Sequence, residues 1–226
     1  MNITIPTHNG EFTYSVIPLP ASAPKLMPFQ DLPFNGDTIA QAKVIELRDK
    51  YGITNAIETG TCLGSTTHFL AQVFSFVTTF ENNLKFRDLA MRRLDGVDDI
   101  TFVAKSSSYG IADEFDLEMG DMSPYERMFF FLDAHWEKSC PLQDELTQIA
   151  FMVNDEGLKP PVIMIHDWKV PDHPEFGFDS YNGQDFEWTW IKPGVDAIYG
   201  PDGYDIEFNS EATGAKRGIL YITPRL

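Results

Sequence analysis

The chain has 226 residues, of which 43% are hydrophobic, and this suffices for a single domain with a full apolar core. Lys and Arg number 17 against 34 Asp and Glu, so the formal net charge is -17. A charge of this sign repels phosphate backbones and anionic lipid surfaces, which disfavours nucleic acid and membranes as partners.

The first 35 residues contain six prolines between short apolar pieces. Prolines at this density favour an extended N-terminal arm or lid over regular structure. Gly36-Asp37-Thr38 then predicts the start of a helix, which has an apolar stripe and ends at Tyr51-Gly52. We therefore predict an arm over residues 1–35 and one domain over residues 36–226.

Strands and helices are predicted to alternate through the middle of the chain. The predicted elements are a strand at 53–58, a helix at 66–74, a strand at 76–81, a helix at 83–94, a strand at 100–105, a strand at 127–133, a helix at 141–153 and a strand at 161–165. Ser106-Ser107-Ser108 opens a further helix or loop. The strand at 127–133 is continuously apolar, as is typical of a parallel sheet buried on both faces.

An irregular, aromatic-rich insertion is predicted at 168–190, followed by a short helix at 195–199 and strands at 204–209 and 217–223. Too few residues separate these last strands for a parallel crossover, so they should form an antiparallel hairpin. The sequence thus predicts an α/β fold, a Rossmann-like doubly wound seven-stranded sheet that is mostly parallel and has a C-terminal antiparallel hairpin.

Residues 55–67 combine a strand end, a turn with Gly60 and Gly64, and a helix start, which is where α/β folds bind nucleotide-like ligands. The turn lacks the third glycine of a dinucleotide fingerprint and the Gly-Lys-Ser/Thr of a phosphate-binding loop. No lysine or arginine lies nearby to neutralise a pyrophosphate, and Glu58 is acidic. These features favour a cationic ligand.

The segment Glu58-Thr-Gly-Thr-Cys-Leu-Gly-Ser-Thr66 resembles motif I of the class I S-adenosylmethionine-dependent methyltransferases, (Glu/Asp)-x-Gly-x-x-x-Gly. Glu81 ends the second predicted strand of the sheet, where a carboxylate can bind a ribose diol. The resemblance places Ser106 and Ser107 near the adenine. The candidate cofactor-binding residues are Glu58, Thr59, Gly60, Thr61, Gly64, Ser65, Thr66, Glu81, Asn82, Ser106, Ser107 and Asp133.

Ionisable residues follow the next two predicted strands: Asp133 and His135, with Trp136, and then His166 and Asp167. Neighbouring parallel strands would bring these side chains together. In one interpretation Asp133, His166 and Asp167 hold a divalent cation such as Mg²⁺, and His135 is the general base. In the other no metal binds, and His135 or His166 accepts the proton while an aspartate orients the imidazole.

Residues 131–136, 140–146 and 165–168 resemble bacterial O-methyltransferases that act on sugars and antibiotic precursors. Some relatives bind magnesium through an acidic pair after the fifth strand, and here His166 stands where that pair would begin. The resemblance implies transfer of a methyl group to a hydroxyl of a small-molecule acceptor. Within the insertion, Tyr181, Trp188 and Trp190 are candidates to stack on it.

Two other functions stay open, an NAD-linked Rossmann oxidoreductase and a non-catalytic S-adenosylmethionine-binding protein. Asp144 and Glu145 are interpreted as a solvated helix face. Two cysteines, no signal-peptide pattern and no long apolar run predict a soluble cytoplasmic protein. Formation of a homo-oligomer is left open.

Overall fold

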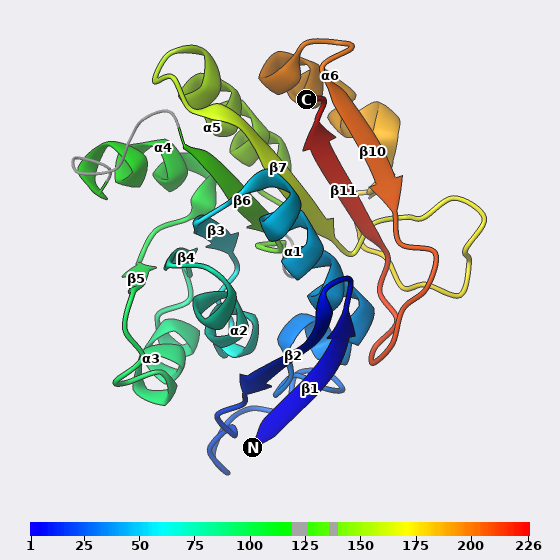
Figure 1. Ribbon diagram of the computed structural model, residues 1–226. Coiled ribbons are helices and arrows are strands. Elements are labelled where there is room, and N and C mark those ends of the chain that lie inside the picture. The colour runs from blue at the N-terminus through cyan, green and yellow to red at the C-terminus, as the bar shows by residue number, and fades with distance from the viewer. Residues whose placement is uncertain (119–125, 136–139) are drawn as a thin grey trace.

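A seven-stranded sheet forms the centre of the computed structural model, which describes residues 1–118, 126–135 and 140–226 (Figure 1). The strand order is β10-β11-β7-β6-β3-β4-β5. The strands are β3 (Asn55–Thr59), β4 (Phe76–Phe80), β5 (Ile100–Val103), β6 (Arg127–Leu132), β7 (Lys159–His166), β10 (Tyr204–Phe208) and β11 (Ile219–Pro224). The strands from β7 to β5 are parallel, and β11 is antiparallel to both neighbours. The predicted fold class is confirmed, including the C-terminal hairpin.

Helices cover both faces of this sheet and give it two apolar cores. They are α1 (Thr38–Tyr51), α2 (Ser65–Val73), α3 (Leu84–Arg93), α4 (Ser107–Glu118), α5 (Leu142–Asn154) and α6 (Trp188–Tyr199). Phe129 and Phe131 of β6 pack in the core that includes α1 and α2, whereas Phe130 packs in the core that includes α5 and α6. Burial on both faces explains the continuous apolar run. Among the described residues, no helix has the length and apolar character to cross a membrane.

Helix α1 has capping residues at both ends. The Asp37 carboxylate accepts hydrogen bonds from the backbone N–H groups of Ile39 and Ala40, at 3.0 and 3.2 Å. Gly52 ends the helix in the left-handed conformation, with φ of 63°. These are standard start and stop signals, and the predicted bounds of this helix agree with the structure.

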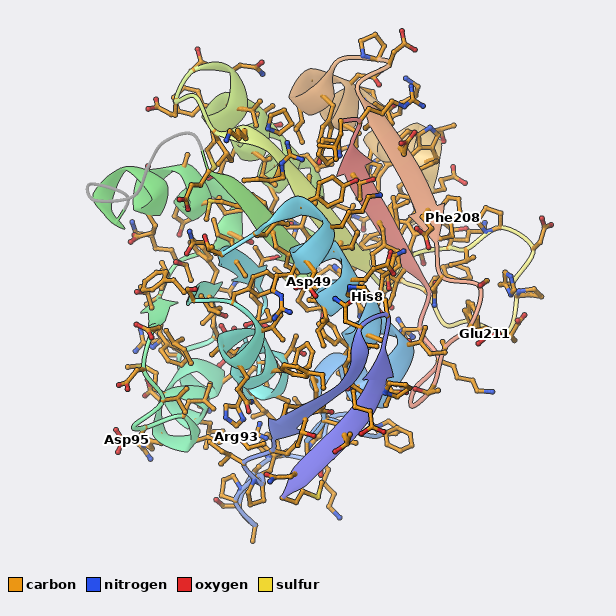
Figure 2. The ribbon with its side chains drawn as sticks, in the orientation of Figure 1. His8, Asp49, Arg93, Asp95, Phe208 and Glu211 are labelled. Atoms are coloured by element: carbon orange, nitrogen blue, oxygen red, sulfur yellow. The ribbon has the colours of Figure 1, made fainter. Side chains whose placement is uncertain are left out.

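The N-terminal region is more regular than the proline count predicts. Strands β1 (Asn2–Thr7) and β2 (Gly10–Ser15) form an antiparallel hairpin against α1 and α2, in front of the sheet in Figure 1. Figure 2 shows His8 at the hairpin turn beside Asp49 of α1, with 3.5 Å between His8 Nε2 and Asp49 Oδ2. Only one of the six prolines, Pro6, lies within the hairpin, on a two-stranded sheet where its missing N–H is tolerated.

Residues 16–37 are irregular apart from the short 3-10 element η1 (Pro33–Gly36). Arg93 at the end of α3, labelled in Figure 2, donates hydrogen bonds to the carbonyls of Ile17 and Leu63 and to the Ser65 hydroxyl. The segment is therefore attached beside the turn that follows β3. Whether residues 1–35 act as a separate arm or lid stays a prediction.

The insertion after β7 contains more regular structure than predicted. Two short strands, β8 (Ser180–Tyr181) and β9 (Gln184–Asp185), pair with each other, and α6 begins at Trp188 rather than at Val195. A proline inside a helix removes one hydrogen bond and usually marks a helix boundary. Pro193 is nevertheless accommodated inside α6, so the predicted start was wrong.

Candidate active site

The register of the parallel strands brings the predicted site to one edge of the sheet. Thr59 of β3 is aligned with Phe80 of β4 and Leu132 of β6, and Leu132 is aligned with Ile165 of β7. The residues that follow these four positions are Gly60, Glu81, Asp133 and His166. They meet at the carboxyl ends of the strands, which is the edge where open α/β sheets bind ligands.

The turn between β3 and α2 requires glycine. Gly60 and Gly64 have φ of 87° and 75°, a region that other residues rarely adopt. A Cβ atom at Gly60 would lie 2.5 Å from the Asp133 carbonyl oxygen, so the turn lies directly on the end of β6. One at Gly64 would lie 3.0 Å from Leu94 of the α3 end. The two glycines thus serve both the turn conformation and its close packing.

Glu58 is buried beneath this turn and is 1% exposed. Its Oε2 accepts hydrogen bonds from the Thr67 and Thr79 hydroxyls at 2.5 and 2.6 Å, whereas Oε1 is buried without a partner. Burial raises the pKa of the carboxyl to about 8, although the two hydroxyls act to lower it. A buried carboxylate oxygen without a donor is costly, so Glu58 is prepared to receive a cationic or hydrogen-bond-donating ligand. Thr61 extends the network, with its hydroxyl 2.6 Å from that of Thr79.

Glu81 fixes the same turn from the end of β4. Its Oε2 accepts from the Cys62 N–H and its Oε1 from the Asn83 N–H, both at 2.8 Å. Each carboxylate oxygen keeps a further lone pair, so the pair can still accept from a ribose diol. Asn82 is exposed beside it.

Ser65 and Thr66 have side chains committed to the N-terminal segment. The Ser65 hydroxyl donates to the Gln30 carbonyl at 2.7 Å, and the Thr66 hydroxyl accepts from the Phe34 N–H at 3.1 Å. Contacts of these two residues with a cofactor would therefore come from the backbone at the start of α2. At the start of α4, Ser107 is buried and Ser106 is partly exposed.

The four predicted reaction-centre residues do lie together. His135 Nε2 is 3.2 Å from Asp167 Oδ2 and 3.5 Å from Asp133 Oδ1. His166 Nδ1 is 3.3 Å from Asp133 Oδ1 and 3.1 Å from Asp167 Oδ1. Of these four contacts, only the His135–Asp167 contact has hydrogen-bond geometry. Both ring nitrogens of His166 are buried without a hydrogen-bond partner. Trp136 lies outside the described residues.

In this cluster the neighbouring ionisable groups shift the pKa values more strongly than burial does. Burial would lower the pKa of both imidazoles, but Asp167 and Asp133 raise the pKa of His135 and raise that of His166 well above its usual value. Burial would likewise raise the pKa of Asp167, but His166 and His135 hold it well below its usual range. The two aspartates thus make both imidazoles stronger proton acceptors, and the imidazoles in turn favour the ionised form of Asp167.

The prediction that Asp144 and Glu145 form a solvated helix face was wrong for Glu145. Asp144 is exposed, whereas Glu145 is buried. Glu145 of α5 is 1% exposed, and burial raises its pKa to about 7. Hydrogen bonds from Ser107 and Thr59 act in the opposite direction and lower this pKa. Thr59 Oγ1 also accepts from the Asp133 N–H at 3.2 Å. Glu145 therefore connects the start of α4 with Thr59 at the end of β3, and Thr59 in turn holds the backbone of Asp133. The apolar face of α5 could have shown this, because Leu142, Leu146 and Ile149 bracket Glu145 at helical spacing.

The insertion supplies the apolar surroundings of His135. The His135 ring packs edge-on against Phe186 with 4.7 Å between ring centroids, and against Tyr181 at 6.3 Å. Trp190 stacks on Phe186 at 5.4 Å, whereas Trp188 packs against Tyr204 of β10. Tyr181 and Trp190 therefore lie on the active-site side of the insertion, and Trp188 contacts the C-terminal hairpin.

A separate cavity of about 250 Å³ opens at the amino-terminal edge of the sheet, on the opposite side from these residues. It is lined in part by Lys50, Arg127 and Lys159. None of the predicted site residues contributes to it.

No protein-family model and no curated protein sequence matches the chain. Solved structures share its fold, however. The O-methyltransferase TomG from Streptomyces achromogenes, involved in tomaymycin synthesis and solved with S-adenosylmethionine, has 16% identity and a TM-score of 0.55 over 83% of this chain and 80% of its own.

Two further structures show the same similarity. An amino pentose methyltransferase from Micromonospora echinaspora, involved in calicheamicin biosynthesis, has 14% identity and a TM-score of 0.52 over 83% of this chain and 91% of its own. An O-methyltransferase from Bacillus cereus has 18% identity and a TM-score of 0.51 over 92% of this chain and 84% of its own. The chain therefore has the Rossmann-like fold of S-adenosylmethionine-dependent methyltransferases.

Proposed function

We propose that this protein transfers the methyl group of S-adenosylmethionine to a hydroxyl oxygen of a small molecule. The observation that carries the proposal is the buried, unpartnered Oε1 of Glu58 beneath a two-glycine turn. A cationic cofactor beside that oxygen would favour the ionised carboxyl and be attracted to it, whereas a pyrophosphate gains no such attraction. The TomG and Bacillus cereus proteins, which share the fold, are O-methyltransferases by name, and this supports oxygen as the acceptor atom.

When bound, S-adenosylmethionine supplies an electrophilic methyl group. The residues of this chain would position the acceptor and remove its proton. His135 is the favoured general base, because Asp167 orients its ring through a hydrogen bond. Asp133, whose side chain is 25% exposed against 2% for each histidine, is the group best placed to contact the acceptor. In this arrangement His135 would accept the hydroxyl proton, which leaves the acceptor oxygen free to take the methyl group that the cofactor supplies when bound.

In a metal-assisted alternative, a divalent cation would be held by residues of the same cluster. Asp133, His166 and Asp167 each offer a ligand atom within 4.8 Å of the others. The ring nitrogens of His166 are buried without hydrogen-bond partners, which favours a ligand there. A bound Mg²⁺ would lower the pKa of the acceptor hydroxyl.

Ligand-dependent thermal unfolding tests the choice of cofactor. S-adenosylmethionine and S-adenosylhomocysteine should raise the melting temperature, and NADH should leave it unchanged. The reverse pattern would establish the oxidoreductase alternative. Transfer of a labelled methyl group to a panel of sugar and aromatic hydroxyl acceptors then tests catalysis. Cofactor binding with no transfer to any acceptor class, in wild type and in Asp167→Asn alike, would favour a non-catalytic binding protein.

The chain is further proposed to act in the cytoplasm on a small-molecule acceptor. The acidity of the chain supports this over a nucleic-acid or membrane partner.

A further inference from the structure

Arg217, which lies just before β11, reaches into the proposed active site and was not singled out by the sequence. Its Nε donates a short hydrogen bond to Asp167 Oδ1, and its Nη2 donates another to Asp179 Oδ1 of the insertion. The side chain is 27% exposed, so this guanidinium is partly withdrawn from solvent. A charge-assisted pair in such a position is stronger than one on an open surface.

The backbone around Arg217 is arranged to hold it. Residues 216–218 pair with Gly177, whose N–H donates to the Lys216 carbonyl and whose carbonyl accepts from the Gly218 N–H, both at 2.9 Å. A Cβ atom at Gly177 would lie 2.6 Å from Arg217 Nη1, so the guanidinium lies against bare backbone. The insertion is thus connected to Asp167 in two ways, by backbone hydrogen bonds from Gly177 and by the ion pairs of Arg217.

Arg217 uses the same carboxylates as the candidate cation clusters. Asp167 Oδ1 faces both Arg217 Nε and His166 Nδ1, while Oδ2 faces His135. A second cluster of metal-ligand type, formed by His135, Asp167 and Asp179, contains both carboxylates that Arg217 binds. A divalent cation in either cluster would compete with a guanidinium that is already present.

We propose that Arg217 takes the place of a divalent cation at Asp167, so that the site is organised by an arginine and works without a bound metal. Arg217 is then a positioning residue that holds Asp167 for His135 and holds the insertion against the site. Arginine suits this role because its planar fork is always charged and can bridge two carboxylates, whereas lysine offers a single point charge. The effect on methyl transfer rests on the proposed function, but the competition with a cation does not.

Titration of the purified chain with Mn²⁺, followed by calorimetry and by the electron paramagnetic resonance of free Mn²⁺, tests the proposal. Arg217→Met should bind Mn²⁺ at least about tenfold more tightly than wild type, because a positive charge beside the ligand oxygens has been removed. Arg217→Lys should lie between the two. Adding Asp167→Asn to Arg217→Met should abolish the gain. Equal binding by wild type and Arg217→Met, or tighter binding by wild type, would overturn the proposal.

Two matched variants separate competition from general effects of charge. Arg225→Met removes an exposed arginine near the C-terminal end of β11 that pairs with Asp205 at 2.7 Å. Lys169→Met removes a cation of the insertion that pairs with Asp185 at 2.6 Å. Neither should change Mn²⁺ affinity. If either does so as strongly as Arg217→Met, the effect reflects net charge and the proposal fails.

Thermal unfolding and S-adenosylhomocysteine affinity are measured on every variant. If Arg217→Met does not fold, Arg217→Gln replaces it, because it removes the positive charge, keeps a polar side chain and leaves Asp167 and Asp179 intact; it too should raise Mn²⁺ affinity, and no rise contradicts the proposal. In a folded wild type that transfers methyl groups, a chelator should leave the rate unchanged. Failure to bind S-adenosylhomocysteine would instead count against the proposed function.

Discussion

Glu58 and Asp167 are both carboxylates at the carboxyl edge of the same sheet, yet they are held in opposite protonation states. Glu58 is surrounded by neutral hydroxyl donors, and burial raises its pKa to about 8. Asp167 is also largely buried, but the two imidazoles hold its pKa well below the usual range. The difference shows that neighbouring charge, rather than depth in the protein, decides whether a buried carboxyl is ionised.

Each state suits a different task. A mostly protonated Glu58 with one unpartnered oxygen can change its charge when a cation arrives. A permanently ionised Asp167 can keep His135 in one orientation throughout a reaction. The glycine turn is thus a region prepared for a ligand, and the ends of β6 and β7 form a region prepared for proton transfer.

Removing the charge of Asp167 should have the largest effect. Asp167→Asn keeps the shape of the side chain but loses the carboxylate that orients His135, so we expect kcat to fall by about 10²–10⁴-fold, the usual contribution of a general base. Affinity for S-adenosylhomocysteine should not change, since the contacts of Asp167 are to the proton-transfer group. Steady-state kinetics and calorimetry measure the two quantities. Asp185→Asn in the same insertion is the control, and a kcat equal to that of this control would refute the assignment.

Removing the ionisable group of Glu58 should have the next largest effect, on binding rather than on turnover. We expect Glu58→Gln to weaken S-adenosylmethionine binding by about tenfold, the value of one charge-assisted contact. In wild type the affinity should increase from pH 6 to pH 8, because the cation favours the ionised carboxyl.

The pH dependence is the sharper part of this experiment. In Glu58→Gln the affinity measured by calorimetry should not vary over the same pH range. Glu126→Gln, at the opposite edge of the sheet where Glu126 accepts from Thr54, is the matched control. A wild-type affinity that falls as the pH rises would show that Glu58 does not face the cofactor.

Glu145 provides an intermediate case, because burial raises its pKa to about 7 while Ser107 and Thr59 favour the charged form. Glu145→Gln should reduce kcat several-fold by loosening Thr59, which accepts from the Asp133 N–H. The KM for S-adenosylmethionine should rise by a similar factor because Ser107 loses its partner. Asp144→Asn is the exposed control on the same turn of α5. Unchanged kcat and KM in Glu145→Gln would limit Glu145 to a structural role.

Much of the architecture could be predicted because each strand carries its own signal. The continuous run Met128–Leu132 indicates burial on both faces, and the short connection between the last two strands excludes a parallel pair. The four ionisable residues at the carboxyl ends of β6 and β7 could be placed together because neighbouring parallel strands end at one edge.

Arg217 could not be placed from the sequence in the same way. It lies fifty residues from Asp167 along the chain, and its contact depends on the path of the insertion past Gly177. The burial of Glu145 was missed for a different reason. Two adjacent acidic residues usually mark a solvated face, and here this holds for Asp144 but not for Glu145. The local sequence pattern thus identifies residues that lie at strand ends, whereas contacts between residues on different loops can be seen only in the tertiary structure.

The last expected effect concerns stability, and it follows from the same contrast. Glu58 has a pKa of about 8 in the fold against 4.5 for an ordinary glutamate, so between these pH values the native state binds the extra proton. The free energy of unfolding should therefore decrease as the pH rises through this window. His135 and His166, whose pKa values are raised, act in the same direction, because their contribution is lost as the pH rises through the folded pKa. Asp167, whose pKa is lowered, contributes only to a loss of stability in acid. Urea unfolding from pH 6 to pH 8 should show the decrease in wild type and a shallower one in Glu58→Gln; equal slopes would mean that Glu58 is already ionised in the folded protein.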